Sequence, residues 1–231
     1  MKTHEYFMEK CIDLAKKGIQ DVSPNPMVGS IIVYNDEIIG QGYHEKYGSN
    51  HAEVNAINSV QDKSLLEKST LYVNLEPCCH HGKTPPCTDL IIEKKIPKVV
   101  IGCIDSYSKV SGNGIKKLRN NLIEVIDCVL DKKCKELNRR FFSFHEKKRP
   151  YIILKWAESK DGFIGPEIKH NNRGKVKYLT KLKDRILVHR WRKEEESILI
   201  GVQTLIDDNP KLTNRHTQGR SPIKILFDPN N

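Results

Sequence analysis

Three residues of this chain have the types and the spacing of zinc ligands. His51 supplies an imidazole, and Cys78 and Cys87, each directly preceded by a proline, supply two thiolates. Catalytic zinc sites have three protein ligands and leave the fourth position open to water, whereas structural sites are closed by four ligands. The set therefore predicts a metal centre that carries out chemistry.

A carboxylate that is not needed as a ligand lies two residues after the histidine. Glu53 can take a proton from water that zinc has acidified and can return it to a substrate. His-x-Glu followed by Pro-Cys pairs is typical of zinc-dependent nucleobase deaminases. Cys79 is a rival ligand, but its side chain should point in a different direction from that of Cys78.

Three hypotheses are compatible with this pattern. The leading one is a pyrimidine deaminase. A deaminase of nucleic-acid bases is the alternative, although its cysteines usually follow the pattern Pro-Cys-x-x-Cys and here eight residues separate them. A non-enzymatic zinc scaffold would need Cys79 or His80 as a fourth ligand. Each half of the pattern alone also has an ordinary explanation, because His-x-Glu occurs on helix surfaces and cysteines occur in cores.

The candidate ligands should lie at the ends of helices and strands. We predict a helix over 51–60 capped by Asn50, a strand over 70–75 before Cys78, and a helix over 87–95. The remaining elements are expected as a helix around 8–15, strands over 29–34 and 37–42 joined by a turn at Asn35-Asp36, a strand over 98–104, and helices over 114–121 and 131–144. This alternation predicts a three-layer α/β/α domain with a mixed sheet.

A charged stretch divides the chain into two expected units. Residues 1–145 form the first domain, residues 146–150 read as a linker, and residues 151–231 form a second domain. In the second domain we predict strands over 151–156, 197–201 and 223–227 and a helix over 179–193.

Composition favours a globular protein of the cytoplasm. No run of about 18 apolar residues could cross a membrane, and the first residues have no apolar signal region. The net charge of +10 is uneven, with 21 Lys and Arg against 19 Asp and Glu up to residue 147 and 18 against 10 after it. Such a basic surface suits a phosphorylated small molecule as well as nucleic acid, and we expect no nucleic-acid partner.

Residues 1–145 resemble the deaminase half of the bifunctional riboflavin-biosynthesis deaminase/reductases. The resemblance rests on residues 24–29, 42–44, 51–54 and 75–87, and the long spacing between the two cysteines is characteristic of that family. It implies a cytidine-deaminase-like fold, zinc bound by His51, Cys78 and Cys87, and Glu53 as the proton shuttle. It also implies hydrolytic removal of ammonia from a phosphoribosylamino-pyrimidine on the route from GTP to flavins.

Four residues are candidates for contacts with such a substrate. Asn25 lies in a proline-flanked turn, and its amide can pair with the edge of a heterocycle. His44, His80 and Lys83 can donate hydrogen bonds to the substrate or to its phosphate, although each histidine is equally compatible with an ordinary surface or core position. The chain departs from the family at 105–108, where Asp-Ser-Tyr-Ser replaces Asp-Pro-Asn-Pro.

Residues 151–231 resemble the reductase half of the same family, which has a dihydrofolate-reductase-like α/β fold. The matching segments are residues 154–162, 188–192, 200–204 and 207–215. The resemblance implies that Thr204 and Asp208 contact NADPH, with Ser159 and Tyr178 near it. It also implies that Arg192 and Arg215 hold the substrate phosphate, for which the forked donors of arginine are suited.

The family has further strands and a glycine-rich segment after this region, which cradles the NADP phosphates. Residues 151–231 contain no such segment, so we expect a partial reductase domain. These 231 residues should therefore deaminate without reducing, and the second domain should be the more mobile one. A homo-oligomer is the default expectation.

Overall fold

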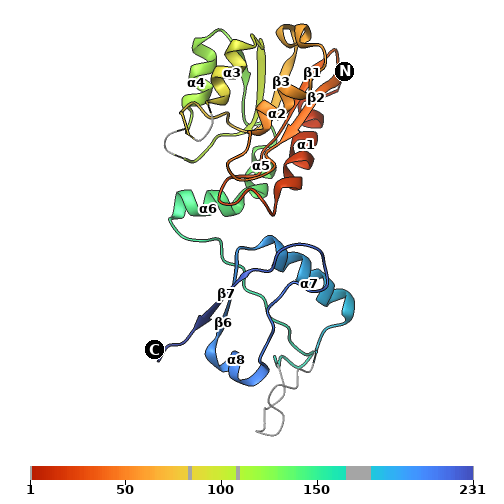
Figure 1. The fold of residues 1–231 in the computed structure, drawn as a ribbon, viewed down its shortest axis with the longest axis vertical. Coiled ribbons are helices and arrows are strands. Elements are labelled where there is room, and N and C mark those ends of the chain that lie inside the picture. Colours follow the sequence, from red (N-terminus) through yellow and green to blue (C-terminus); the bar gives the residue numbers. More distant parts are fainter. Residues whose placement is uncertain (1, 83–84, 108–109, 165–177, 231) are drawn as a thin grey trace. The chain divides into compact units, whose positions relative to one another are not determined.

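The structure, a computed structural model, describes residues 2–82, 85–107, 110–164 and 178–230 (Figure 1). The chain divides into two compact units, Met1–Tyr151 and Ile152–Asn231. Residues 146 and 147 of the expected linker continue a helix of the first unit. Among the described helices, none has the length and the apolar composition needed to cross a membrane.

The first unit is built on a five-stranded mixed sheet in the order β2-β1-β3-β4-β5. Its strands are β1 (Gly29–Tyr34), β2 (Glu37–Tyr43), β3 (Thr70–Leu75), β4 (Lys98–Cys103) and β5 (Glu124–Ile126). Strand β1 is antiparallel to β2 and β3, whereas β3, β4 and β5 are parallel. The predicted turn at Asn35 and Asp36 is confirmed, and both residues have the positive φ that a two-residue hairpin loop requires.

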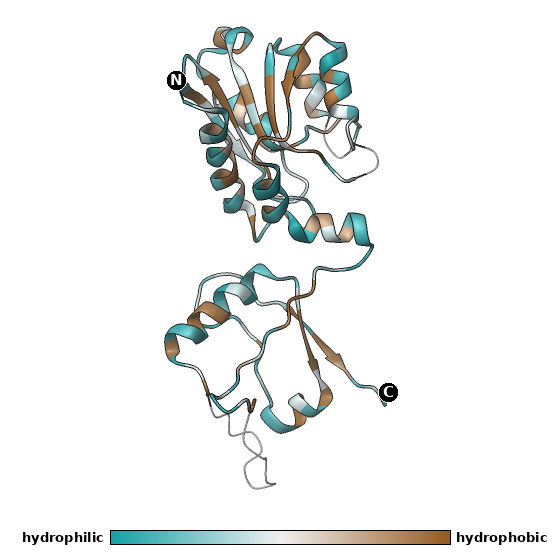
Figure 2. Ribbon diagram, turned by 180° about the vertical axis from the view of Figure 1, so that it is seen from behind, coloured by the Kyte–Doolittle hydropathy of each residue, from teal (hydrophilic) through white to brown (hydrophobic). Residues whose placement is uncertain are grey.

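Helices cover both faces of this sheet and give the three-layer α/β/α arrangement that the sequence predicts. One face carries α2 (Ala52–Ser59), α3 (Cys87–Glu93) and α4 (Asn113–Asn120), and the other carries α1 (His4–Ala15), α5 (Asp131–Leu137) and α6 (Arg139–Lys147). Neighbouring residues of β1 point to opposite cores, with Ile32 in the first and Ile31 in the second. The apolar strands lie between helices whose outer faces are hydrophilic (Figure 2).

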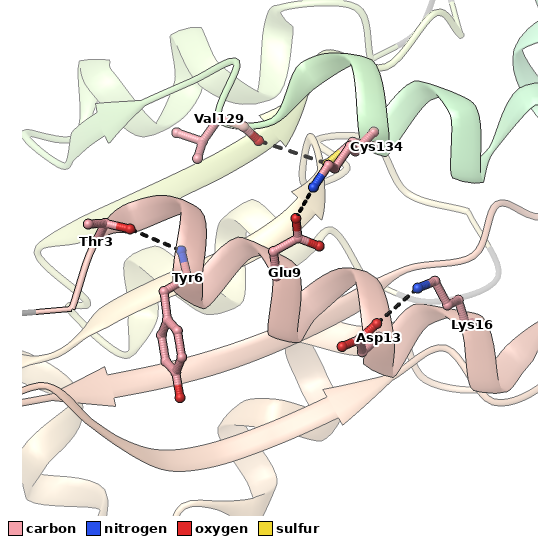
Figure 3. Close-up of polar contacts among 8 residues, drawn as sticks. Thr3, Tyr6, Glu9, Asp13, Lys16, Val129 and Cys134 are labelled. Carbon is pink, nitrogen blue, oxygen red and sulfur yellow. Dashed lines mark hydrogen bonds and ion pairs between the residues drawn. The ribbon is translucent and has the colours of Figure 1, made fainter.

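Short 3-10 segments at Lys16–Gly18 and Lys63–Lys68 complete the first unit. Thr3 caps α1 by accepting a hydrogen bond from the backbone of Tyr6 at 3.2 Å, and Lys16 pairs with Asp13 at 2.9 Å (Figure 3). Glu9 of α1 forms an ion pair with Lys133 of α5, which ties these two helices together on the outer face of the sheet.

The structure corrects two predicted helices of the first unit. The expected helix over 131–144 is broken at Asn138, because the side chain of Asn138 binds both polar groups of the Met27 backbone at 2.8 and 2.9 Å. The prediction that Asn50 caps a helix from His51 is also wrong. His51 is the N-cap residue of α2, while the carbonyl of Asn50 accepts a hydrogen bond from the ring of His44.

The second unit contains α7 (Leu182–Glu194), β6 (Ser197–Gly201), α8 (Val202–Asp208) and β7 (Ile223–Phe227). The predicted strands β6 and β7 are confirmed and pair in parallel. The predicted strand over 151–156 is wrong. A strand needs a paired neighbour, and within the described parts of this unit β6 and β7 pair only with each other.

Candidate metal centre and substrate pocket

The three predicted zinc ligands converge from three separate elements. His51 lies at the start of α2, Cys87 is the first residue of α3, and Cys78 follows β3. Nδ1 of His51 lies 3.5 Å from Sγ of Cys78 and 3.3 Å from Sγ of Cys87, and all three ligand atoms lie within 4.8 Å of one another. A tetrahedral zinc with bonds of about 2.05 Å to nitrogen and about 2.3 Å to sulfur would separate these atoms by about 3.5 Å. The triangle therefore fits zinc.

Hydrogen bonds prepare this triangle for a cation. The thiol of Cys87 and, to a lesser extent, the ring of His51 lower the pKa of Cys78 to about 4, against the opposite effect of burial. The pKa of Cys87 is raised because its proton is shared with Cys78, and burial adds to this. The backbone N–H of Cys87 also donates to the sulfur of Cys78 at 3.3 Å. One thiolate is thus already favoured, and metal binding would release the proton from the second.

Glu53 lies beside the triangle on the first turn of α2. Its side chain is buried, and burial raises its pKa, while the neighbouring His51 works in the opposite direction. A carboxyl group whose pKa is raised towards neutrality is suited to both accepting and releasing a proton. The rival ligand Cys79 is not part of the cluster.

Asn25 and His44 form a pair in the same pocket. The ring of His44 donates from Nδ1 to the carbonyl of Asn50 at 3.0 Å, so its Nε2 accepts from the Asn25 amide at 3.1 Å. Burial lowers the pKa of His44, which agrees with a neutral ring. Both ring nitrogens are therefore engaged, and His44 orients the Asn25 amide instead of presenting a free donor to a substrate.

Two buried asparagines hold the loop that carries Asn25. Asn74 of β3 accepts from the backbone of Gly29 at 2.7 Å and donates to the Met27 carbonyl at 3.1 Å, and Asn138 binds both the N–H and the carbonyl of Met27. Sequence reasoning missed both residues. The signal for Asn74 was present, since it is the one amide side chain in a central strand of mostly apolar residues.

One cavity of about 420 Å³ adjoins the candidate metal centre. His51, Glu53 and Cys78 form one part of its lining, and Tyr107 lies between the rings of His80, at 5.8 Å, and His145 of α6, at 5.2 Å. Asn25, His44 and His80 thus all face the space beside the candidate metal centre. Lys83, the fourth predicted substrate contact, lies outside the described residues.

In the second unit, the two predicted phosphate contacts, Arg192 and Arg215, lie near each other. Arg192 donates to the Thr213 carbonyl at 2.8 Å, and the charge of the nearby Arg215 adds to burial in lowering its pKa. Thr204 and Asp208 lie on α8. No described contact joins Ser159, which hydrogen-bonds within its own turn, or Tyr178, which packs against Arg185, to these residues.

The matches with known protein families fall into two separate parts of the chain. Residues 1–103 match the cytidine and deoxycytidylate deaminase zinc-binding region, and residues 150–231 match the RibD C-terminal domain. The riboflavin biosynthesis proteins RibD of Actinobacillus pleuropneumoniae and Aquifex aeolicus are each 42% identical over 96% of this chain, which covers 57% and 61% of their lengths. A crystal structure of the Thermotoga maritima diaminohydroxyphosphoribosylaminopyrimidine deaminase/5-amino-6-(5-phosphoribosylamino)uracil reductase superposes with a TM-score of 0.87 and 46% identity, covering 96% of this chain and 62% of that one.

The fold and the three-ligand triangle define a zinc-binding protein of the cytidine-deaminase-like class, joined to a reductase-like domain. The chain belongs to the riboflavin-biosynthesis deaminase/reductase family and spans about three fifths of the length of the relatives it matches.

Proposed function

We propose that the first unit hydrolyses 2,5-diamino-6-(5-phosphoribosylamino)pyrimidin-4(3H)-one to 5-amino-6-(5-phosphoribosylamino)uracil and ammonia. The observation that carries this proposal is the fit of His51, Cys78 and Cys87 to zinc, with the buried Glu53 lining the same cavity. The names and the similarity of the relatives support the choice of substrate.

Each residue of the site has a role in this proposal. His51, Cys78 and Cys87 would hold the zinc, and zinc when bound makes water acidic enough to supply hydroxide near neutral pH. Glu53 takes the water proton and delivers protons to the ring nitrogen and to the departing ammonia. Asn25, oriented by His44, pairs with the heterocycle edge. His80 and Lys83 would donate hydrogen bonds to the substrate or to its phosphate.

For the second unit, we propose that residues 151–231 carry part of the reductase site of the family, with the assignments that the resemblance implies. Thr204 and Asp208, with Ser159 and Tyr178, are the proposed NADPH contacts, and Arg192 and Arg215 are the proposed phosphate contacts. The closeness of the two arginines supports only the phosphate assignment. We further propose that the protein acts in the cytoplasm.

The test is ammonia release from the phosphoribosylated pyrimidine by the zinc-loaded chain, with the product identified by mass spectrometry with and without NADPH. We expect a product that has exchanged an amino group for oxygen, and loss of turnover after zinc is removed by a chelator. Cytidine and single-stranded RNA serve as competing substrates. Faster release of ammonia from RNA would favour the nucleic-acid alternative, for which the net charge of +10 is the supporting observation.

A further inference from the structure

Glu76, which comes directly before the Pro77–Cys78 ligand segment, has a buried carboxylate that accepts four backbone hydrogen bonds. One oxygen accepts from Gly114 at 2.9 Å and from Ile115 at 3.2 Å. The other accepts from Gly112 at 2.9 Å and from Asp105 at 3.2 Å. The side chain is 3% exposed, so these bonds form away from water and the carboxylate is fully occupied by this chain's own backbone.

The four donors lie at the two ends of one loop. Asp105 follows β4, and the other three residues begin α4, whose N-cap Gly112 has no side chain to cap the helix. The first backbone N–H groups of a helix have no partner within the helix, and here a distant carboxylate supplies one. Gly114 approaches so closely that a Cβ at this position would collide with the Pro77 carbonyl. Glu76 therefore fixes both ends of residues 105–112 to the segment that carries Cys78.

The described part of that loop is a wall of the cavity. Asp105, Tyr107 and Val110 line it, and Asp105 accepts a hydrogen bond from the Tyr107 backbone at 2.7 Å, which stiffens the turn between them. Tyr107 in turn contacts His80 of the ligand loop and His145 of α6. The position of this wall relative to the zinc ligands thus depends on the bonds to Glu76.

We propose that Glu76 is a positioning residue that sets the distance between the zinc-ligand segment and the wall formed by Asp105, Tyr107 and Val110, and so determines how tightly the substrate is bound. Glu76 itself lines the cavity, but its two carboxylate oxygens are occupied by the four backbone donors, so it acts through the position of the wall. The proposal rests on the proposed function for the identity of the substrate. Contacts made equally in the ground state and the transition state change KM and leave kcat, so a displaced wall should appear in KM.

The first experiment compares the wild-type chain with Glu76→Gln. Glutamine keeps the size of the side chain, but its amino group would face two N–H donors and cannot accept from them. We expect one zinc per chain to remain and KM to rise at least about tenfold with kcat changed less than about threefold. Amide exchange should accelerate at least about tenfold at the pair of donors that faces the new amino group, either Gly112 and Asp105 or Gly114 and Ile115. Glu93→Gln, in an exposed surface pair, is the matched control and should change none of these.

A second variant covers the case in which Glu76→Gln does not fold. Gly114→Ala leaves the carboxylate intact but forces α4 away from Pro77, and it should raise KM in the same way. Unchanged amide exchange, or faster exchange with an unchanged KM, would overturn the proposal. If the wild-type chain releases no ammonia from the pyrimidine, the proposed function fails, whereas the amide exchange measured without substrate still decides whether Glu76 holds the wall.

Discussion

Glu53 and Cys78 lie in one buried pocket, yet their acidities change in opposite directions. Burial raises the pKa of Glu53, while the hydrogen bond from Cys87 lowers the pKa of Cys78 to about 4. The two pKa values move in opposite directions because hydrogen bonds to the Cys78 sulfur outweigh the effect of its burial, whereas burial is the largest effect on Glu53. The thiolate is thereby prepared to bind a metal and the carboxyl group to carry a proton.

The ligand assignment predicts which cysteines the metal needs. Cys78→Ala and Cys87→Ala should both lose zinc, because two protein ligands rarely hold it, whereas Cys79→Ser should keep it. The measurement is zinc per chain by elemental analysis after dialysis. Full occupancy in Cys87→Ala would contradict the assignment.

The role of Glu53 predicts a separation between binding and chemistry. Glu53→Gln should keep zinc and the fold but lose about 10²- to 10⁴-fold in kcat, the usual contribution of a general acid–base group. Glutamine has similar size but cannot accept the water proton. Turnover at half the wild-type rate or more, at saturating substrate, would rule out this role.

The sequence alone could predict the candidate zinc site, because the side-chain types and the spacing of its residues are typical of zinc-dependent deaminases. These residues are His51, Glu53, Cys78 and Cys87. The sequence could not predict the roles of Glu76, Asn74 and Asn138. They act on backbone groups, which every residue has, so their partners leave no pattern in the sequence. Their importance appears only when the fold brings distant backbone segments to them.

At the scale of elements, the central strands and the hairpin turn could be predicted, whereas the break between α5 and α6 could not. The apolar and charged pattern of residues 131–144 suits one continuous helix, and the break arises from the bonds of Asn138 to Met27, more than a hundred residues away. Similarly, residues 151–156 have the composition of a strand but no described partner strand. Local propensity yields to tertiary contacts in both cases.

The bond between Asn138 and Met27 predicts a stability change with a matched control. Asn138→Ala leaves the buried Met27 N–H without its acceptor and removes one of the two amides that donate to the Met27 carbonyl, so it should cost about 1–3 kcal/mol in the free energy of unfolding. Asn121→Ala removes only an exposed bond to Lys117 and should change little. Chemical denaturation of the two variants makes the comparison, and equal costs would contradict the prediction.

His189 of α7 predicts a pH dependence in the second unit. Burial, with help from nearby Arg192, lowers its pKa from 6.5 to about 4. The unfolded chain takes up this proton as the pH falls below about 6.5, while the folded state stays neutral until about pH 4, so the stability of the unit should fall through that window. An NMR titration of the His189 ring should have its midpoint below pH 5, and a midpoint near 6.5 would contradict the burial argument.

At the scale of the whole molecule, the two units differ in how much they bury. The first has two apolar cores on either side of its sheet, whereas His189 and Pro222 are the only buried residues among those described in the second. Large apolar side chains such as Trp156, Leu199 and Phe227 are exposed there. Since burial of apolar surface supplies most of the stability of a domain, the second unit should open more readily.

Limited proteolysis should therefore separate the two units. Lys147 and Lys148 are exposed, and trypsin should cut there and within the second unit while leaving a fragment of about the first 148 residues. The last residue that lines the cavity is His145, so this fragment should retain zinc binding and the proposed deaminase turnover. Mass spectrometry and zinc analysis of the fragment decide this, and loss of turnover upon cleavage would show that the second unit is required.

The hydrogen bond from the backbone N–H of Gly114 to Glu76 also affects the chemical stability of the protein during storage. Asparagine is among the residues that heat damages chemically, and the damage begins when the backbone nitrogen of the following residue attacks the asparagine side chain. Asn113 precedes a glycine, which gives that attack the least steric hindrance, and the attacking nitrogen is the one that donates to Glu76 at 2.9 Å. The hydrogen bond from Gly114 to Glu76 should thus protect Asn113 from conversion to aspartate during long storage.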